Sequence, residues 1–175
     1  MNRSNDDPGG EQPFQSSRGN RVQIYLIGRS EASDLPTPEL EALGRFVLDC
    51  ESLDDTTVSV AIADDSYVHE LNLRYRGRDE PTDVLSFVSD SGDDQMPVNQ
   101  SDCPGRYAGD ILISPEAVAR NAERFGISKE EELRRVMVHG MLHICGRTHE
   151  TNNGDEPMLR LQEEILQRWS GEFQL

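Results

Sequence analysis

The stretch HGMLHICGRTHE, residues 139–150, contains three of the four histidines of this 175-residue chain. His139 and His143 are four residues apart, so in an α-helix they project from the same face, one turn above the other. Gly146 allows the chain to leave that helix in a left-handed conformation and to turn back. His149 can then approach the pair as a third imidazole. This spacing predicts a site where three nitrogens hold one metal ion.

A metal held by three histidines keeps one tetrahedral position for water, which is typical of a catalytic zinc site. The spacing therefore predicts a hydrolase. The alternative is that the three side chains are only solvated or hydrogen-bonded. Against it, the helix face that carries them is otherwise filled by Val, Met, Leu and Ile, where unpaired imidazoles would be costly to bury.

A metalloprotease of the H-E-x-x-H type is disfavoured, because Gly140 stands where that motif has its general base. Glu150 and Asp155 are the nearest carboxylates along the chain that could assist with a proton. Both are more typical of a solvated side chain or a helix cap.

Hydrophobic patterns elsewhere predict a small sheet with helices. Short β-branched or alternating runs predict strands at 22–28, 56–65, 83–88 and 110–114. Apolar residues at helical spacing predict helices at 38–50, 66–77, 115–125, 129–145 and 156–169. This order indicates an α+β domain, in which a small mixed sheet of about four strands packs against helices and the metal-site helix lies near the C-terminus.

The helix boundaries have their own signals. Ser114 and Ser128 are predicted N-caps, as is Thr37, which precedes Pro38. The Asp pair at 64–65 is predicted to cap the helix after the second strand. Three helices are predicted to end at a glycine: Gly77, Gly126 and Gly146.

Composition limits the domain organisation. Residues 1–20 are polar and rich in Gly, Pro and Ser, so we predict a disordered tail, followed by a single domain at 21–175. The polar segment 90–106 is predicted to be a mobile loop.

Three widely spaced cysteines without a C-x-x-C pair indicate reduced thiols. Without a long apolar run or a targeting signal, a cytoplasmic protein with no membrane segment is expected.

The histidine stretch resembles the motif H-G-x-L-H-L-x-G-Y-D-H of the YbeY endoribonucleases, which mature bacterial ribosomal RNA. It has the three histidines, both glycines and the leucine in register. It departs at Ile144, and at Arg147 and Thr148, which replace Tyr-Asp. The resemblance extends to LNLRYRGRDEPTDVLSFV at 71–88 and AGDILIS at 108–114, so it spans roughly residues 60–170.

The resemblance implies a metal-dependent endoribonuclease specific for single strands. Its role would be maturation of the 3′ end of small-subunit ribosomal RNA and ribosome quality control. One zinc ion per chain would be bound by His139, His143 and His149. Arg76 would hold the scissile phosphate, and the candidate cleft residues are Asp83, Ser86 and Arg147. The implied partners are single-stranded RNA and the ribosome or its assembly proteins.

The local positive charge supports this interpretation, whereas the net charge of the whole chain opposes it. Arg74, Arg76 and Arg78 concentrate positive charge, and a guanidinium suits phosphate, although each could instead pair with a nearby acid. The whole chain has 17 basic and 33 acidic residues and a formal charge of −16, which disfavours binding to free RNA. We therefore expect a ribosomal partner to deliver the substrate.

Two other functions fit the residues. One is a ribosome-associated factor without catalysis, in which the zinc is structural and folding depends on it. The other is a metal-dependent hydrolase of a small molecule, which the acidic surface and the Arg147-Thr148 pair leave open. The residues select neither the native metal nor the attacking group, which is water or the RNA 2′-hydroxyl.

Overall fold

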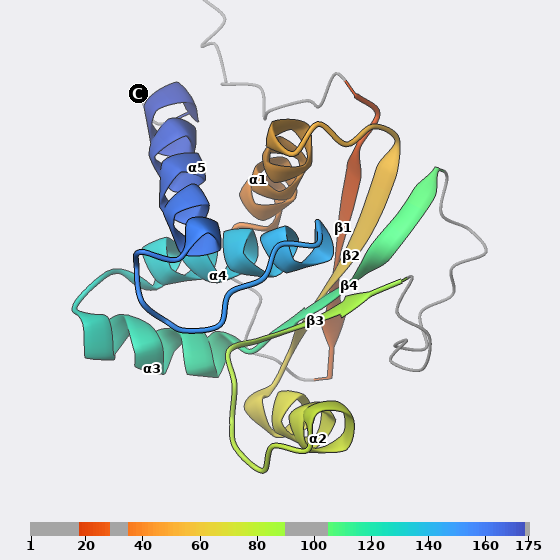
Figure 1. The fold of residues 1–175 in the computed structure, drawn as a ribbon. Helices are drawn as coiled ribbons and strands as arrows, with labels where there is room; N and C mark the ends of the chain where they lie inside the picture. The colour runs from red at the N-terminus through yellow and green to blue at the C-terminus, as the bar shows by residue number, and fades with distance from the viewer. Residues whose placement is uncertain (1–17, 29–34, 90–104, 174–175) are drawn as a thin grey trace, which may run out of the picture.

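The computed structural model describes residues 18–28, 35–89 and 105–173. Most of the predicted tail at 1–20 and most of the predicted mobile loop at 90–106 lie outside these residues. A four-stranded sheet forms the centre, with the order β1-β2-β4-β3 (Figure 1). Its strands are β1 Arg21–Ile27, β2 Thr56–Ala63, β3 Val84–Val88 and β4 Arg106–Ile113. The predicted small sheet is confirmed.

The sheet is mixed, as predicted. β1, β2 and β4 are parallel, and only β3 runs antiparallel, on β4. β4 begins at Arg106, four residues before the predicted strand, because Arg106 and Tyr107 pair with the start of β2 at Thr56 and Thr57. Pairing with a neighbour thus extends the strand into a segment whose own pattern is not strand-like. β3 is left as an edge strand next to the histidine helix.

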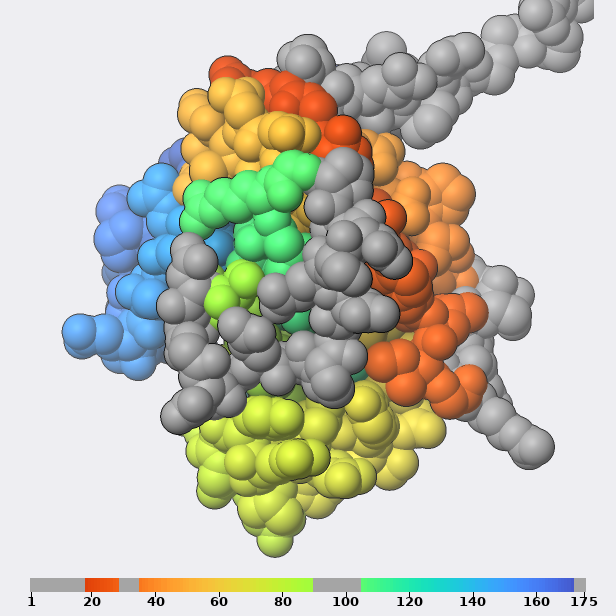
Figure 2. All heavy atoms as spheres, turned by 90° about the vertical axis from the view of Figure 1, so that its right-hand side faces the viewer, coloured from red at the N-terminus to blue at the C-terminus, as the bar shows by residue number. Residues whose placement is uncertain are grey.

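Helices cover both faces of the sheet (Figure 1). The larger core lies between one face and the helices α1 Thr37–Cys50, α3 Pro115–Phe125, α4 Lys129–Ile144 and α5 Pro157–Phe173. α2 Asp65–Arg76 packs on the other face through Val68 and Leu71, which meet Phe87 and Leu112 in a smaller core. Figure 2 shows α2 projecting at the lower end of that face. The end of α2 and β3 are thereby brought together.

Most predicted helix caps are present. The Asp64, Ser114 and Ser128 side chains each accept a backbone N–H three residues later. Gly77 and Gly126 end α2 and α3 with φ of 66° and 68°. The prediction for Thr37 is wrong: α1 already begins at Thr37, and its side chain makes no cap bond. The Pro36 carbonyl starts the helical ladder by accepting from the Leu40 N–H at 3.0 Å.

Asn20, the last residue of the predicted tail, is buried, with 4% of its surface exposed. Its Nδ2 donates to Asp49 Oδ1 and to the Leu53 carbonyl, both at 2.7 Å, and its Oδ1 accepts from the Thr56 N–H at 3.0 Å. One amide therefore joins the start of β1 to the turn between α1 and β2. Three tertiary hydrogen bonds therefore fix Asn20, which its composition had assigned to the tail.

Gly140 determines how closely α4 approaches the sheet. A Cβ at this position would lie 2.9 Å from Ile111 Cγ2 on β4 and 3.3 Å from Val84 Cγ2 on β3. A glutamate here would have to displace the Ile111 and Val84 side chains, so this close packing disfavours the H-E-x-x-H general base. The same close approach places His139 and His143 beside β3.

Within the described residues, no helix combines the length and apolar character needed to cross a bilayer.

Candidate metal centre and its cleft

The three predicted histidines meet at the C-terminal end of α4. His139 and His143 lie on successive turns, with their Nε2 atoms 3.1 Å apart. Gly146 adopts φ of +84°, and the chain then turns so that the His149 ring centroid lies 5.0 Å from that of His139 and 5.3 Å from that of His143. One nitrogen from each ring falls within 4.8 Å of the others. This group could hold a metal ion.

Each ring is oriented by a hydrogen bond from Nδ1. The acceptors are Gln162 Oε1 for His139 at 2.9 Å, the Arg147 carbonyl for His143 at 2.9 Å and the Thr151 carbonyl for His149 at 3.0 Å. A carbonyl oxygen only accepts, so each Nδ1 carries the proton and each Nε2 keeps its lone pair. Metal-binding histidines are typically held in this way.

The donor set fits a zinc ion. With both Nδ1 atoms protonated, the lone pairs of His139 Nε2 and His143 Nε2 face each other across 3.1 Å and repel unless a cation lies between them. Two nitrogens that bind one zinc ion at about 2.0–2.1 Å are roughly 3.3 Å apart in tetrahedral geometry. The three imidazoles at the edge of the cleft would therefore be able to hold such an ion.

Local electrostatics keep these rings neutral. Burial, followed by the neighbouring His139, lowers the pKa of His143 from 6.5 to about 4. Burial also lowers the pKa of His139, although its hydrogen bond to Gln162 opposes that shift. At pH 7 both rings are therefore in the uncharged form that a metal requires, and binding need not displace a proton from them.

A cleft of about 710 Å³ opens beside the histidines. Its walls come from the end of α2, the following loop, β3, the end of α4 and the loop to His149. They are lined by Asn72, Arg76, Arg78, Glu80, Thr82, Val84, Leu85, Ser86, Val88, His139, His143, Gly146, Arg147, Thr148 and His149. Segments far apart in the sequence thus form one polar depression with the histidines at one side.

Arg76 lies in this cleft, as the resemblance implied. Its Nη2 donates to the Ser86 carbonyl at 2.8 Å, and its guanidinium lies over the Phe87 ring, 5.7 Å from the centroid. The positive charge is close enough to contribute to the lowered pKa of His143. Arg76 is exposed, so the guanidinium donors that do not bind Ser86 can reach an anion in the cleft.

Arg147 also lines the cleft, but its charge is matched. Its Nε and Nη2 donate to the two carboxylate oxygens of Glu51 at 2.8 and 3.3 Å. The Glu51 side chain is only 9% exposed, so separating the pair would leave a buried carboxylate without its partner. The positive charge of Arg147 is therefore neutralised. The ion pair ties the end of α1 to the loop whose carbonyl orients His143.

The other candidate cleft residues differ in their positions. Ser86 lines the cleft, and its Oγ donates to the Gly140 carbonyl at 3.3 Å. Asp83 does not line it. Its Oδ2 accepts from Asn121 at 2.9 Å in a neighbouring cavity of about 330 Å³, and its carbonyl accepts from the Ser114 N–H. Asp83 is bonded to α3 instead, although its charge still reaches His139, where it opposes the lowering of the pKa by burial.

Two site residues were missed from the sequence. Asn72 is buried, lines the cleft and donates from Nδ2 to the Glu80 carbonyl at 2.8 Å. Gln162, on α5, is the partner of His139. Gln162 did have a signal, because it interrupts a buried stripe formed by Met158, Ile165 and Trp169. Neither Glu150 nor Asp155 is among the residues that line the cleft.

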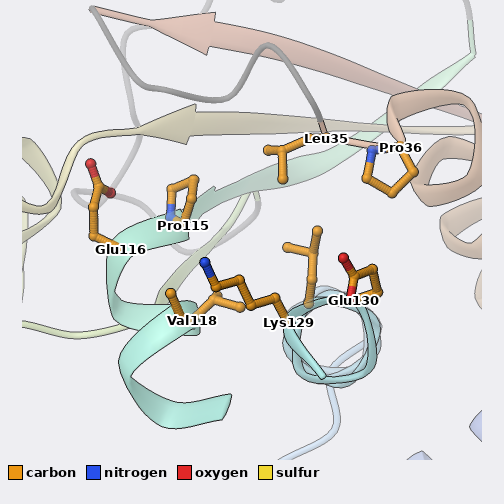
Figure 3. Close-up of a pocket in the computed structure, with 9 residues that line it drawn as sticks. Leu35, Pro36, Pro115, Glu116, Val118, Lys129 and Glu130 are labelled. Carbon is orange, nitrogen blue, oxygen red and sulfur yellow. The ribbon is translucent and has the colours of Figure 1, made fainter. Parts of the chain in front are cut away.

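Another cavity, of about 320 Å³, lies between the N-terminal ends of α1, α3 and α4 (Figure 3). Leu35, Pro36, Pro115 and Val118 give it apolar walls, and Lys129 and Glu130 lie at its edge. It is lined by no histidine or cysteine among the described residues. The three histidines and Arg76 therefore line the cleft beside α4 and not this cavity.

The chain is similar in sequence and in structure to known proteins. A protein from Treponema pallidum named "Endoribonuclease YbeY" is 40% identical over 136 residues, which cover 75% of this chain and 81% of that protein. One of the same name from Roseiflexus castenholzii is 48% identical over 145 residues, covering 83% and 82%. The solution structure of TM1509 from Thermotoga maritima matches with a TM-score of 0.56 and 30% identity, over 87% of this chain and 91% of that one.

The sequence model described as "Endoribonuclease YbeY" matches residues 28–170, which include the whole cleft and all three histidines. Together with relatives at these identities over most of their length, this match shows that the chain belongs to the YbeY endoribonuclease family.

Proposed function

We propose that this protein is a metal-dependent endoribonuclease that cleaves single-stranded RNA, with one zinc ion held by His139, His143 and His149. Its substrate is the 3′ end of small-subunit ribosomal RNA, and it acts in ribosome quality control in the cytoplasm, where ribosomes assemble. One observation carries the proposal. Three Nε2 lone pairs converge at the side of a cleft that also presents an arginine with guanidinium donors to spare.

The cleft residues have different chemical roles in this proposal. The histidines bind the metal, and zinc in such a site lowers the pKa of water and polarises a phosphoryl oxygen. Arg76 binds a non-bridging oxygen of the scissile phosphate and stabilises the charge that develops there. Ser86 and Asn72 shape the wall beside it. Hydrolysis adds an attacking oxygen to phosphorus and breaks the bond to the leaving ribose oxygen.

The role of Arg76 can be tested against Arg74, two residues earlier on α2. Arg74 lies over the Tyr75 ring and does not line the cleft. We expect Arg76→Ala to lower kcat/KM for a single-stranded RNA copy of the ribosomal 3′ end by about 100- to 1,000-fold, the usual loss when one donor to transition-state charge is removed. Arg74→Ala should stay near wild type. Equal losses in both variants would refute a specific phosphate contact.

Recruitment by the ribosome predicts weak binding to free RNA with only a shallow dependence on salt. Arg147 is paired with Glu51, which leaves Arg76 and Arg78 as the cleft arginines for phosphate. Two contacts to a single strand give a slope of log affinity against log salt of roughly −1.4. Binding measured by fluorescence anisotropy in a salt series checks this value. A slope steeper than about −4 would mean an extended RNA-binding surface and would contradict recruitment.

A further inference from the structure

A chain of hydrogen-bonded polar groups, of which Gln162 is buried and the others are partly exposed, leads away from His139. Gln162, on α5, is 5% exposed, and α5 packs against α4, which it crosses at a steep angle (Figure 1). Its Oε1 accepts from His139 Nδ1 at 2.9 Å, while its Nε2 donates to Glu163 Oε1 at 3.0 Å. Both ends of one amide are therefore used.

Glu163 is held in turn by Arg135 on α4. Arg135 Nε donates to Glu163 Oε1 at 3.1 Å, and Nη2 donates to Oε2 at 3.4 Å. The same guanidinium lies 3.5 Å from Glu132 and 3.7 Å from Glu131. Four groups, Arg135, Glu163, Gln162 and His139, thus form a continuous path of hydrogen bonds between the two helices.

The chemistry of these groups gives the path one direction. A guanidinium only donates and a carboxylate only accepts, so Glu163 must receive a proton from the Gln162 amide. The amide nitrogen then faces Glu163 and the amide oxygen faces His139. Because that oxygen can only accept, His139 must carry its proton on Nδ1. Its Nε2 is left with a lone pair directed at the other two histidines.

We propose that Gln162, oriented by the Arg135–Glu163 pair, is a positioning residue that fixes His139 in the Nδ1-protonated tautomer. His143 and His149 are oriented by backbone carbonyls, which a side-chain substitution does not remove. His139 alone depends on a side chain. The consequence for metal affinity rests on the proposed function, whereas the tautomer itself does not.

The environment of Gln162 fits this role. Its neighbours on the inner stripe of α5, Met158, Ile165 and Trp169, are apolar and at most 3% exposed. A buried amide among them costs free energy unless both of its ends are hydrogen-bonded. A purely packing role would be filled better by leucine or methionine. The satisfied amide therefore indicates a function in orienting its partners.

The test compares Gln162→Met, which keeps the volume but removes the acceptor, with Gln162→Glu, which keeps an acceptor. Gln167→Met is the matched control, because Gln167 is an exposed glutamine on the same helix. ¹⁵N spectra of the histidine rings in the metal-free full chain identify the protonated nitrogen. Zinc affinity is measured by competition with a chelator, and thermal unfolding verifies that each variant folds.

We expect His139 to be protonated on Nδ1 in wild type, in Gln167→Met and in Gln162→Glu. In Gln162→Met the Nδ1-protonated form should lose its dominance, and zinc affinity should fall about 10- to 100-fold, as for other residues that orient a metal ligand. An unchanged tautomer in Gln162→Met would overturn the proposal. If wild type bound no zinc while the tautomer shifted as expected, the proposed metal site would fail and the positioning role would stand.

Discussion

Replacing His143 by alanine should lower zinc affinity by more than about 100-fold, a larger loss than that from removing a residue that merely orients a ligand. Two imidazoles would remain, and His139 Nε2 would lose the partner that lies 3.1 Å away. Cleavage of single-stranded RNA should fall to background. The fold should survive, because His143 lies at the border of the cleft and outside both apolar cores.

His69→Ala is the matched control for this variant. His69 is the remaining histidine, lies on α2 and contacts Asp79 at 2.8 Å, outside the cleft. Zinc competition, circular dichroism and cleavage of the ribosomal 3′-end RNA should all remain near wild type. Undiminished cleavage by His143→Ala would remove the metal from the mechanism. Unfolding of wild type by a chelator alone would support a structural zinc instead.

Gly109→Ala should destabilise the fold by about 3 kcal/mol or more, because strain and a steric clash add together. Gly109 has φ of +148°, and a Cβ there would lie 2.1 Å from the Phe87 carbonyl oxygen of β3 and 2.9 Å from Ile144 Cδ1 of α4. Either β3 or the histidine helix must move. The unfolding temperature should fall by roughly 6–12 °C, measured by calorimetry.

Gly154→Ala is the control for this substitution. A Cβ at Gly154 would meet nothing within 4 Å, and its φ is not positive, so its stability should change by less than about 0.5 kcal/mol. Equal stability of the two variants would mean that β3 can retreat from β4 at little cost. It would also show that the cleft wall formed by β3 is not held by this close approach.

The sequence by itself determined the features whose physics is local. A four-residue spacing places His139 and His143 on one helical face whatever surrounds that helix. The hydroxyls of Ser114 and Ser128 reach backbone N–H groups only three residues away, so these caps were predictable. The left-handed turn at Gly146 likewise depends on the absence of one Cβ. The strands and helices followed from apolar patterns of matching period.

Only the tertiary structure decided which distant residues meet. Asp83 and Ser86 are three residues apart, yet only Ser86 lines the cleft, while Asp83 is hydrogen-bonded to Asn121 of α3. Glu51 neutralises Arg147 across 96 positions of the chain. Gln162 reaches His139 because α5 packs against α4. Such contacts depend on the path of the whole backbone, which the residues near any one motif do not specify.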